Sequence, residues 1–240
     1  MKLIGLYIAI FFVFLTGCSK KPQDYFEEGI KKYNAGYIKE AAKLFNKTIQ
    51  IEPENVKARF FIGMCYKKTG KIDKAIEKLH YAYEVSPEDF FILYNLADCY
   101  LMSENFEQSL LFARKSLRIK PDFMESHLVL GISLMKAKRL AEARSELSFI
   151  VKVIQDNGSP VKKEAMLYLA QLYRETDKLK ESKELLEALC KENKMSPEYN
   201  YSLGLTYIAL NNSAKARKQV EILRELKNPL ADALANKISR

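Results

Sequence analysis

The sequence predicts an all-α solenoid of about six stacked helix–turn–helix units. A small residue returns at steps of 34, 34, 34, 39 and 34 residues. This small-residue position holds Gly29, Gly63, Ala97, Gly131, Ala170 and Gly204. Around it, each unit has two apolar stripes at helical spacing, separated by a turn such as that at Gly36 or Gly70. A period of this length is typical of stacked helix pairs, which usually bind other proteins.

Other positions repeat in step with the small residue. Three residues after it, four units have Tyr66, Tyr100, Tyr173 and Tyr207. Twelve residues after it come Ala41, Ala75, Ser109, Ala143, Ser182 and Ala216. Sixteen residues after it come Phe45, Leu79, Ala113, Leu147, Leu186 and Val220. Small residues let two helices approach closely, so each unit is expected to be a tightly packed helix pair.

These residues resemble the tetratricopeptide repeat family. The second unit shows the resemblance best, through Gly63, Tyr66, Gly70, Ala75, Ala82 and Pro87. The resemblance covers roughly residues 22–228. It implies a right-handed α-solenoid whose first helices line a concave groove.

The long step between the fourth and fifth units marks a change along the chain. We expect units one to four in residues 24–155 and units five and six in 156–228, followed by a capping helix in 229–240. The five extra residues lie around 156–160. Gly158 there is interpreted as a helix stop, Ser159 as an N-cap and Pro160 as the first helical residue.

The amino terminus predicts export and lipidation. Met1-Lys2 is followed by an apolar run from Leu3 to Leu15, which is too short to cross a bilayer comfortably. The Leu-Thr-Gly-Cys sequence ending at Cys18 resembles a bacterial lipobox. This resemblance implies a signal peptide in residues 1–17, lipid on Cys18 and a tether in 18–23. A plain secretory signal with a chance cysteine is the alternative.

The residue after Cys18 bears on localisation. In many Gram-negative bacteria, an Asp at that position retains a lipoprotein at the inner membrane, whereas this chain has Ser19. The resemblance therefore implies an anchor in the outer membrane, facing the periplasm.

The net charge of +9 allows acidic partners or anionic lipid. Nucleic acid is not an expected partner of an exported lipoprotein. The densest basic cluster comprises Arg114, Lys115, Arg118, Lys120, Lys136, Lys138 and Arg139. Such charges either keep a solenoid soluble or bind an acidic surface, and both interpretations stay open.

No pattern indicates catalysis, a metal site, a cofactor or a small-molecule substrate. The chain has only two histidines, and His127 is interpreted as a packed residue rather than a base. Cys65 and Cys99 occupy equivalent positions of neighbouring first helices, too far apart for an ordinary disulfide. They are interpreted as small buried hydrophobes.

A second apolar stripe on the first helices predicts the binding surface, because a helix pair alone needs only one such stripe. By the family resemblance, these positions line the concave groove. Packing between neighbouring helices is the alternative. The candidate groove residues are Phe26, Ile30, Tyr33, Phe60, Met64, Phe91, Tyr94, Leu101, Leu128, Ile132 and Met135.

Together these observations predict a non-catalytic, lipid-anchored adaptor that binds a protein or peptide in the periplasm. The repeat count, mature length and anchor resemble those of lipoproteins that pilot secretin assembly for type IV pili. The alternative is a scaffold that organises peptidoglycan hydrolases or other envelope enzymes through its basic surface.

Overall fold

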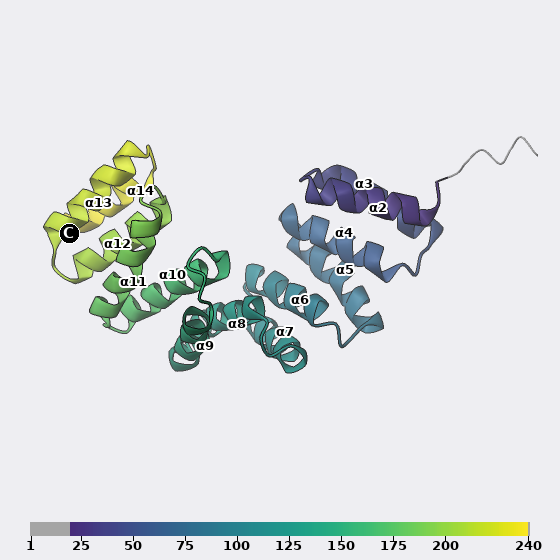
Figure 1. The fold of residues 1–240 in the computed structure, drawn as a ribbon, viewed down its shortest axis with the longest axis horizontal. Helices are drawn as coiled ribbons and strands as arrows, with labels where there is room; N and C mark the ends of the chain where they lie inside the picture. Colours follow the sequence, from purple (N-terminus) through teal and green to yellow (C-terminus); the bar gives the residue numbers. More distant parts are fainter. Residues whose placement is uncertain (1–19, 240) are drawn as a thin grey trace, which may run out of the picture. The chain divides into compact units, whose positions relative to one another are not determined.

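The computed structural model describes residues 20–239, so Cys18 and the predicted signal peptide lie outside the described residues. Every regular element in this part of the chain is a helix (Figure 1). The helices form two compact units, which divide between Pro87 and Glu88 and are described separately.

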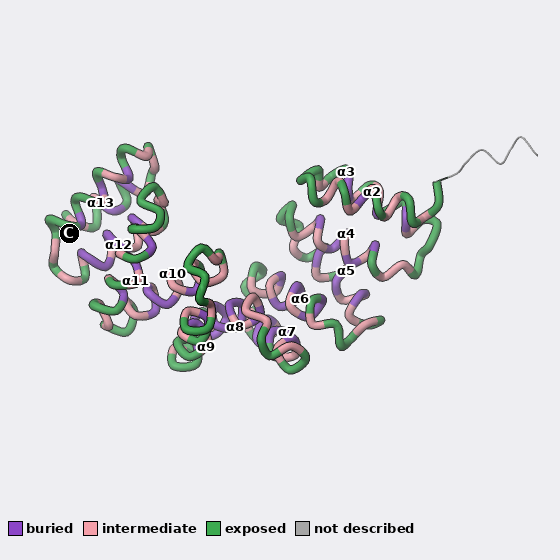
Figure 2. Tube along the Cα trace, in the orientation of Figure 1, coloured by how far each residue is buried: buried purple, intermediate pink, exposed green. Residues whose placement is uncertain are grey.

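The first unit contains two helix pairs. Its helices are α2 (Pro22–Asn34), α3 (Ile38–Ile51), α4 (Val56–Lys68) and α5 (Ile72–Val85). Each helix packs on the next. The core contains Ala41, Phe45, Ala58, Ile62 and Cys65, and the buried stretches in Figure 2 lie along the faces where these helices meet.

The second unit contains four helix pairs and a terminal helix. The first helices of the pairs are α6 (Phe90–Met102), α8 (Met124–Lys136), α10 (Pro160–Glu175) and α12 (Pro197–Ala209). Their partners are α7 (Phe106–Ile119), α9 (Leu140–Val153), α11 (Leu179–Glu192) and α13 (Ser213–Glu225). Each first helix also packs on the first helix of the next pair. The predicted all-α, repeat-built fold class is confirmed.

The small-residue position is small because a large side chain covers it. A Cβ atom added to Gly29 would lie 2.6 Å from Phe45 Cε1, and one added to Gly131 would lie 2.9 Å from Leu147 Cδ2. Both covering side chains stand sixteen residues after their glycine. Where Ala97 occupies the small-residue position, the residue sixteen further on is Ala113. A larger side chain at the first position is thus accompanied by a smaller one at the second.

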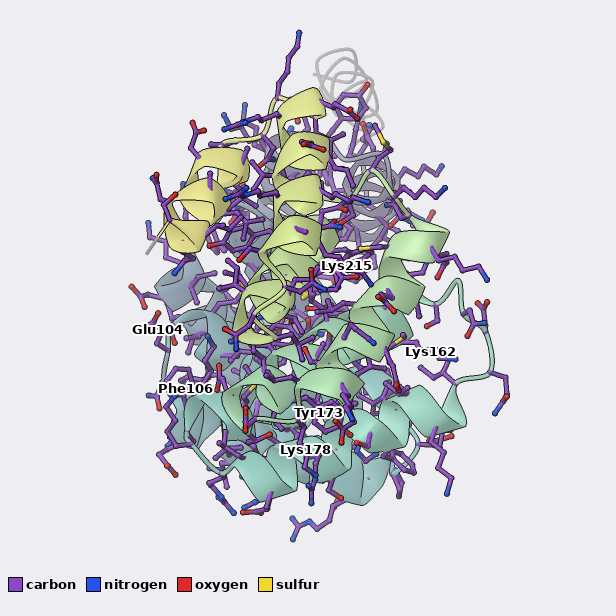
Figure 3. The ribbon with its side chains drawn as sticks, turned by 90° about the vertical axis from the view of Figure 1, so that its left-hand side faces the viewer. Glu104, Phe106, Lys162, Tyr173, Lys178 and Lys215 are labelled. Atoms are coloured by element: carbon purple, nitrogen blue, oxygen red, sulfur yellow. The ribbon has the colours of Figure 1, made fainter. Side chains whose placement is uncertain are left out.

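The turn inside each pair has a fixed geometry. Seven residues after the small-residue position, the backbone is left-handed, with φ of +82° at Gly36 and +72° at Gly70. A backbone hydrogen bond then closes the turn. After α10, for example, Lys178 N donates to the Tyr173 carbonyl at 2.7 Å, and these two residues lie together at the end of that helix (Figure 3). Glycine is suited to this left-handed residue.

The second unit builds the same turn without glycine. There the left-handed residues are Glu104, Lys138, Asp177 and Asn211, with φ between 57° and 62°. Because a Cβ disfavours this conformation, these turns depend on the packing of the helices that they join.

The five extra residues divide between a loop and a helix. The 154–159 loop has two residues more than the other links between pairs, and α10 has three more than the other first helices. Ser159 Oγ accepts from Lys162 N and Pro160 begins α10, as predicted. The interpretation of Gly158 is wrong: α9 already ends at Val153, and Gly158 N donates to Asp156 Oδ1 at 2.8 Å within the loop.

The last helix, α14 (Leu230–Ile238), packs on α12 and α13. Leu234 is fully buried and lies against Gly204, where an added Cβ would clash with Leu234 Cδ2. Leu234 therefore covers the small-residue position of α12.

Buried hydroxyls join successive pairs of the second unit. Ser109 Oγ donates to the Ala97 carbonyl at 2.8 Å and lies 2.7 Å from Ser133 Oγ. Ser182 repeats the arrangement with the Ala170 carbonyl and Thr206. The two serines that replace alanine twelve residues after the small-residue position are therefore satisfied polar residues of the core.

Candidate partner-binding groove

A cavity of about 520 Å³ opens on the first helices α6, α8 and α10 of the second unit. We call it the α6–α8–α10 groove. Figure 1 shows α8 between α6 and α10. The groove is lined by Tyr94, Asp98, Leu101, Met102, Glu125, Leu128, Val129, Ile132, Lys136, Val161, Glu164 and Tyr168.

Four of the predicted groove residues come together here: Tyr94, Leu101, Leu128 and Ile132. Leu128 and Ile132 are only 7% and 5% exposed, because they also pack against Leu147 and its neighbours in the core. They therefore form the floor of the groove, and packing between neighbouring helices accounts for most of their burial.

Two predicted residues of the second unit stand apart from this cavity. Met135 is 3% exposed and is not among the residues lining the groove, so it serves helix packing. Phe91 is 42% exposed, and its ring lies 5.9 Å from Tyr94, outside the lining.

In the first unit, most of the predicted residues pack between helices. Phe26, Ile30 and Tyr33 lie against the core formed by α3 and α4. The ring of Phe61 on α4 lies 5.8 Å from Phe26 and 5.7 Å from Tyr33. Phe61 contacts Phe60 as well, at 5.3 Å, and Phe60 is only 9% exposed.

Met64 is half-buried on α4. For the other four predicted residues of this unit, the alternative of packing between neighbouring helices describes the contacts better than an open groove does.

The α6–α8–α10 groove is acidic as well as apolar. Asp98, Glu125 and Glu164 line it, against one lysine, Lys136. Partial desolvation raises the pKa of the Glu164 carboxyl, and the charges of Asp98 and Glu198 raise it further. Desolvation and the charges of Asp98, Glu125 and Glu164 raise the pKa of Tyr94.

The predicted apolar stripe missed this acidic rim, although the repeat contains a signal for it. Glu125, Glu164 and Glu198 all stand six residues before the small-residue position, in three successive units. Val129 and Tyr168 also line the groove and were missed. They stand two residues before the small-residue position, whereas the predicted stripe followed other positions of the repeat.

The predicted basic cluster lies partly along α7. A second hollow of about 470 Å³ there is lined by Glu107, Leu110, Leu111, Arg114, Lys115, Arg118 and Arg139. Arg139 forms two 2.7 Å hydrogen bonds with Glu142, and Arg114 lies 3.3 Å from the same carboxylate. Part of the positive charge is therefore balanced within the protein.

Within residues 20–239 no disulfide is formed, which agrees with the interpretation of Cys65 and Cys99. Both of these are buried, whereas Cys190 is half-buried. Desolvation raises the pKa of the Cys65 and Cys190 thiols to about 11. They are therefore protonated near neutral pH and weakly nucleophilic.

Within residues 20–239, no group of three or more histidine, cysteine or acidic side chains is arranged to hold a metal ion. No helix in the same range is long and apolar enough to cross a membrane.

Solved structures with the same fold span most of the chain. A tetratricopeptide repeat protein from Parabacteroides merdae is 19% identical, with a TM-score of 0.75, over 92% of this chain and 86% of its own. PilW, described as a widely conserved type IV pilus biogenesis factor, is 15% identical, with a TM-score of 0.79, over 91% of this chain and 100% of its own. The fold is therefore that of tetratricopeptide repeat proteins.

A curated relative matches over a shorter range. The Drosophila melanogaster protein described as "BBSome complex member BBS4 homolog" is 27% identical over 103 residues, which are 43% of this chain. The match spans about a fifth of that relative, 21% of its length. One family matches more than half of the chain, over residues 58–193. The chain belongs to that family, which is described as "Domain of unknown function (DUF7017)".

Proposed function

We propose that this protein is a non-catalytic, lipid-anchored adaptor of the bacterial envelope, and that it binds a protein partner in the α6–α8–α10 groove. The groove carries this proposal. It is large enough for several side chains of a peptide, and it combines the apolar floor of Leu128 and Ile132 with polar groups at its rim.

The anchor is proposed from the sequence ending at Cys18, and the periplasmic location from the same sequence. Assembly of a type IV pilus secretin is the proposed process. Its support is the resemblance in repeat count, mature length and anchor, together with the fold shared with PilW, a pilus biogenesis factor.

Crosslinking in the native cell, followed by purification of the intact lipoprotein from membranes and mass spectrometry, tests the proposal. The groove variant is Leu101→Gln with Met102→Gln, because Leu101 is half-buried and Met102 is 50% exposed in the groove. The control is Ile119→Gln with Val153→Gln, two exposed apolar residues elsewhere in the same unit.

The wild type and the control should capture a secretin or pilus component, and the groove variant should lose it. Equal capture by all three proteins would refute the groove as the binding site. In parallel, Cys18→Ala should release the protein from the membrane fraction, and a variant that stays there would contradict lipid anchoring.

The second candidate function is an envelope scaffold that uses the hollow along α7. The observation that favours it is that four basic side chains, Arg114, Lys115, Arg118 and Arg139, line this hollow against one acidic one, Glu107. Arg114→Glu with Arg118→Glu should then abolish capture of wall hydrolases, while the groove variant keeps it. Under the groove proposal, this charge reversal changes capture little.

A further inference from the structure

The charge in the α6–α8–α10 groove opposes the charge of the whole chain. The protein carries a net charge of +9, yet three of the four ionisable carboxylate or ammonium groups that line the groove are acidic. The acidic residues come from three helices: Asp98 from α6, Glu125 from α8 and Glu164 from α10. The field inside the groove is therefore set locally by these residues.

The three carboxylates line the groove together with apolar and aromatic side chains. No three acidic residues of the described chain form a metal-binding group, so the groove is not built for a bare cation. Tyr94 and Tyr168 stand in the lining beside Leu101 and Leu128. An aromatic face flanked by carboxylates suits a guanidinium or ammonium group on an apolar stem.

We propose that the groove recognises a peptide segment of the partner protein that presents an arginine or lysine between apolar side chains. This inference rests on the proposed function and names the chemistry of the partner. Charge complementarity selects the occupant: the apolar residues of the segment contact Leu128 and Ile132, and its cation pairs with Asp98 and Glu164. Arginine is favoured, because its planar guanidinium can pair with a carboxylate and stack on a tyrosine ring at the same time.

The acidic rim has a cost that a bound cation would remove. Because the pKa of Glu164 is raised in the folded chain, its ionised form is less stable there than in the unfolded chain. This penalty is absent below the unfolded pKa and complete above the folded one. Glu164 is also exposed at the rim of the groove, so its carboxyl is accessible to a ligand while its charge does not stabilise the fold, a pattern typical of functional residues.

The experiment is a binding screen on the full chain, purified from membranes in detergent. An array of synthetic 12-residue peptides of random sequence is the probe. Bound peptides should be enriched in arginine or lysine flanked by apolar residues. For a selected peptide, Asp98→Asn with Glu164→Gln should lower affinity by about tenfold or more and weaken its dependence on salt.

The matched control is Glu181→Gln with Glu184→Gln, which removes the same charge from exposed residues of α11 and should leave affinity unchanged. A thermal melt adds a second measurement. Glu164→Gln should raise the unfolding temperature at pH 7 while it weakens binding. If it lowers the unfolding temperature and leaves binding unchanged, Glu164 supports the fold and the assignment to ligand binding is wrong.

The outcomes separate this inference from the proposed function. If selected peptides are neutral or acidic and still lose affinity in the Leu101→Gln, Met102→Gln variant, the groove binds peptides but the cationic preference is refuted. If binding is insensitive to both groove variants, or if no peptide binds, the groove proposal itself fails.

Discussion

Complementary volumes at single residues hold each helix pair together. Gly131 is covered by Leu147, which is fully buried, and the equivalent pair in the preceding unit is Ala97 with Ala113. The chain thus uses a glycine under a large residue at Gly131, two alanines at Ala97 and Ala113, and an alanine under a leucine at Ala170 and Leu186. This exchange suggests a direct test of the packing.

Gly131→Ala should destabilise the protein by about 1–3 kcal/mol through overpacking. Leu147→Ala should cost about 2–5 kcal/mol through a cavity. The double variant recreates the Ala97–Ala113 arrangement, so its loss should be smaller than the sum by about 0.5–3 kcal/mol. Denaturant unfolding of the four proteins measures this coupling, and strict additivity would contradict the proposed contact.

His127 makes stability depend on pH. Its Nδ1 lies 2.7 Å from Glu146 Oε2, and its Nε2 lies 2.8 Å from the Pro121 carbonyl, so both ring nitrogens face acceptors. Desolvation lowers the pKa of His127, but the bonds to Glu146 and Pro121 outweigh it, and the net pKa is raised from 6.5. The imidazolium is therefore favoured in the folded state.

The stability that His127 contributes should be complete below pH 6.5 and should fall as pH rises through the folded pKa. Glu146→Gln should flatten this part of the profile, because the amide no longer stabilises the imidazolium. Unfolding free energies between pH 5.5 and 9 provide the measurement. A wild type that gains stability over the same range, relative to this variant, would show that His127 is neutral in the fold.

At the scale of elements, the terminal helix α14 closes the second unit. Leu234 is fully buried against the small-residue position of α12, and Ala231 is 3% exposed. Without this cover, the apolar faces of α12 and α13 would meet water, as at any uncapped end of a repeat stack.

Leu234→Ala should therefore destabilise the protein by about 2–5 kcal/mol. Amide hydrogen exchange should accelerate first in α12 and α13, the two helices that α14 contacts. Asn236→Ala, an exposed position of the same helix, is the control and should change neither quantity. Faster exchange confined to α14 would show that the helix covers nothing essential.

The elements were predictable because the repeat reports on local packing. Gly131 lies sixteen residues before Leu147, which covers it, and Ser159 directly precedes Pro160, so each signal lies within one repeat and can be read from the linear sequence. The end of α9 was not predictable from Gly158, because the helix stops five residues earlier and the glycine belongs to a loop closed by Asp156.

At the scale of the whole molecule, the site was predictable only in part. Tyr94, Leu101, Leu128 and Ile132 were identified because an apolar stripe repeats along the helices. Met135 was misplaced because the same stripe also serves helix packing. The acidic rim is formed by residues from α6, α8 and α10 that the fold brings together. The net charge of the whole chain is positive, so it predicted the opposite sign from the local charge of the groove.

The buried thiols can report on local opening of the folded chain. Cys65 lies on α4 of the first unit and Cys99 on α6 of the second, and both are buried, whereas Cys190 on α11 is only half-buried. A thiol-modifying reagent reaches a buried sulfur only when its surroundings open, so the rate of labelling at each cysteine reports the free energy of that local event. Cys65 and Cys99, one in each unit, can therefore time the loosening of their own regions without any engineered label.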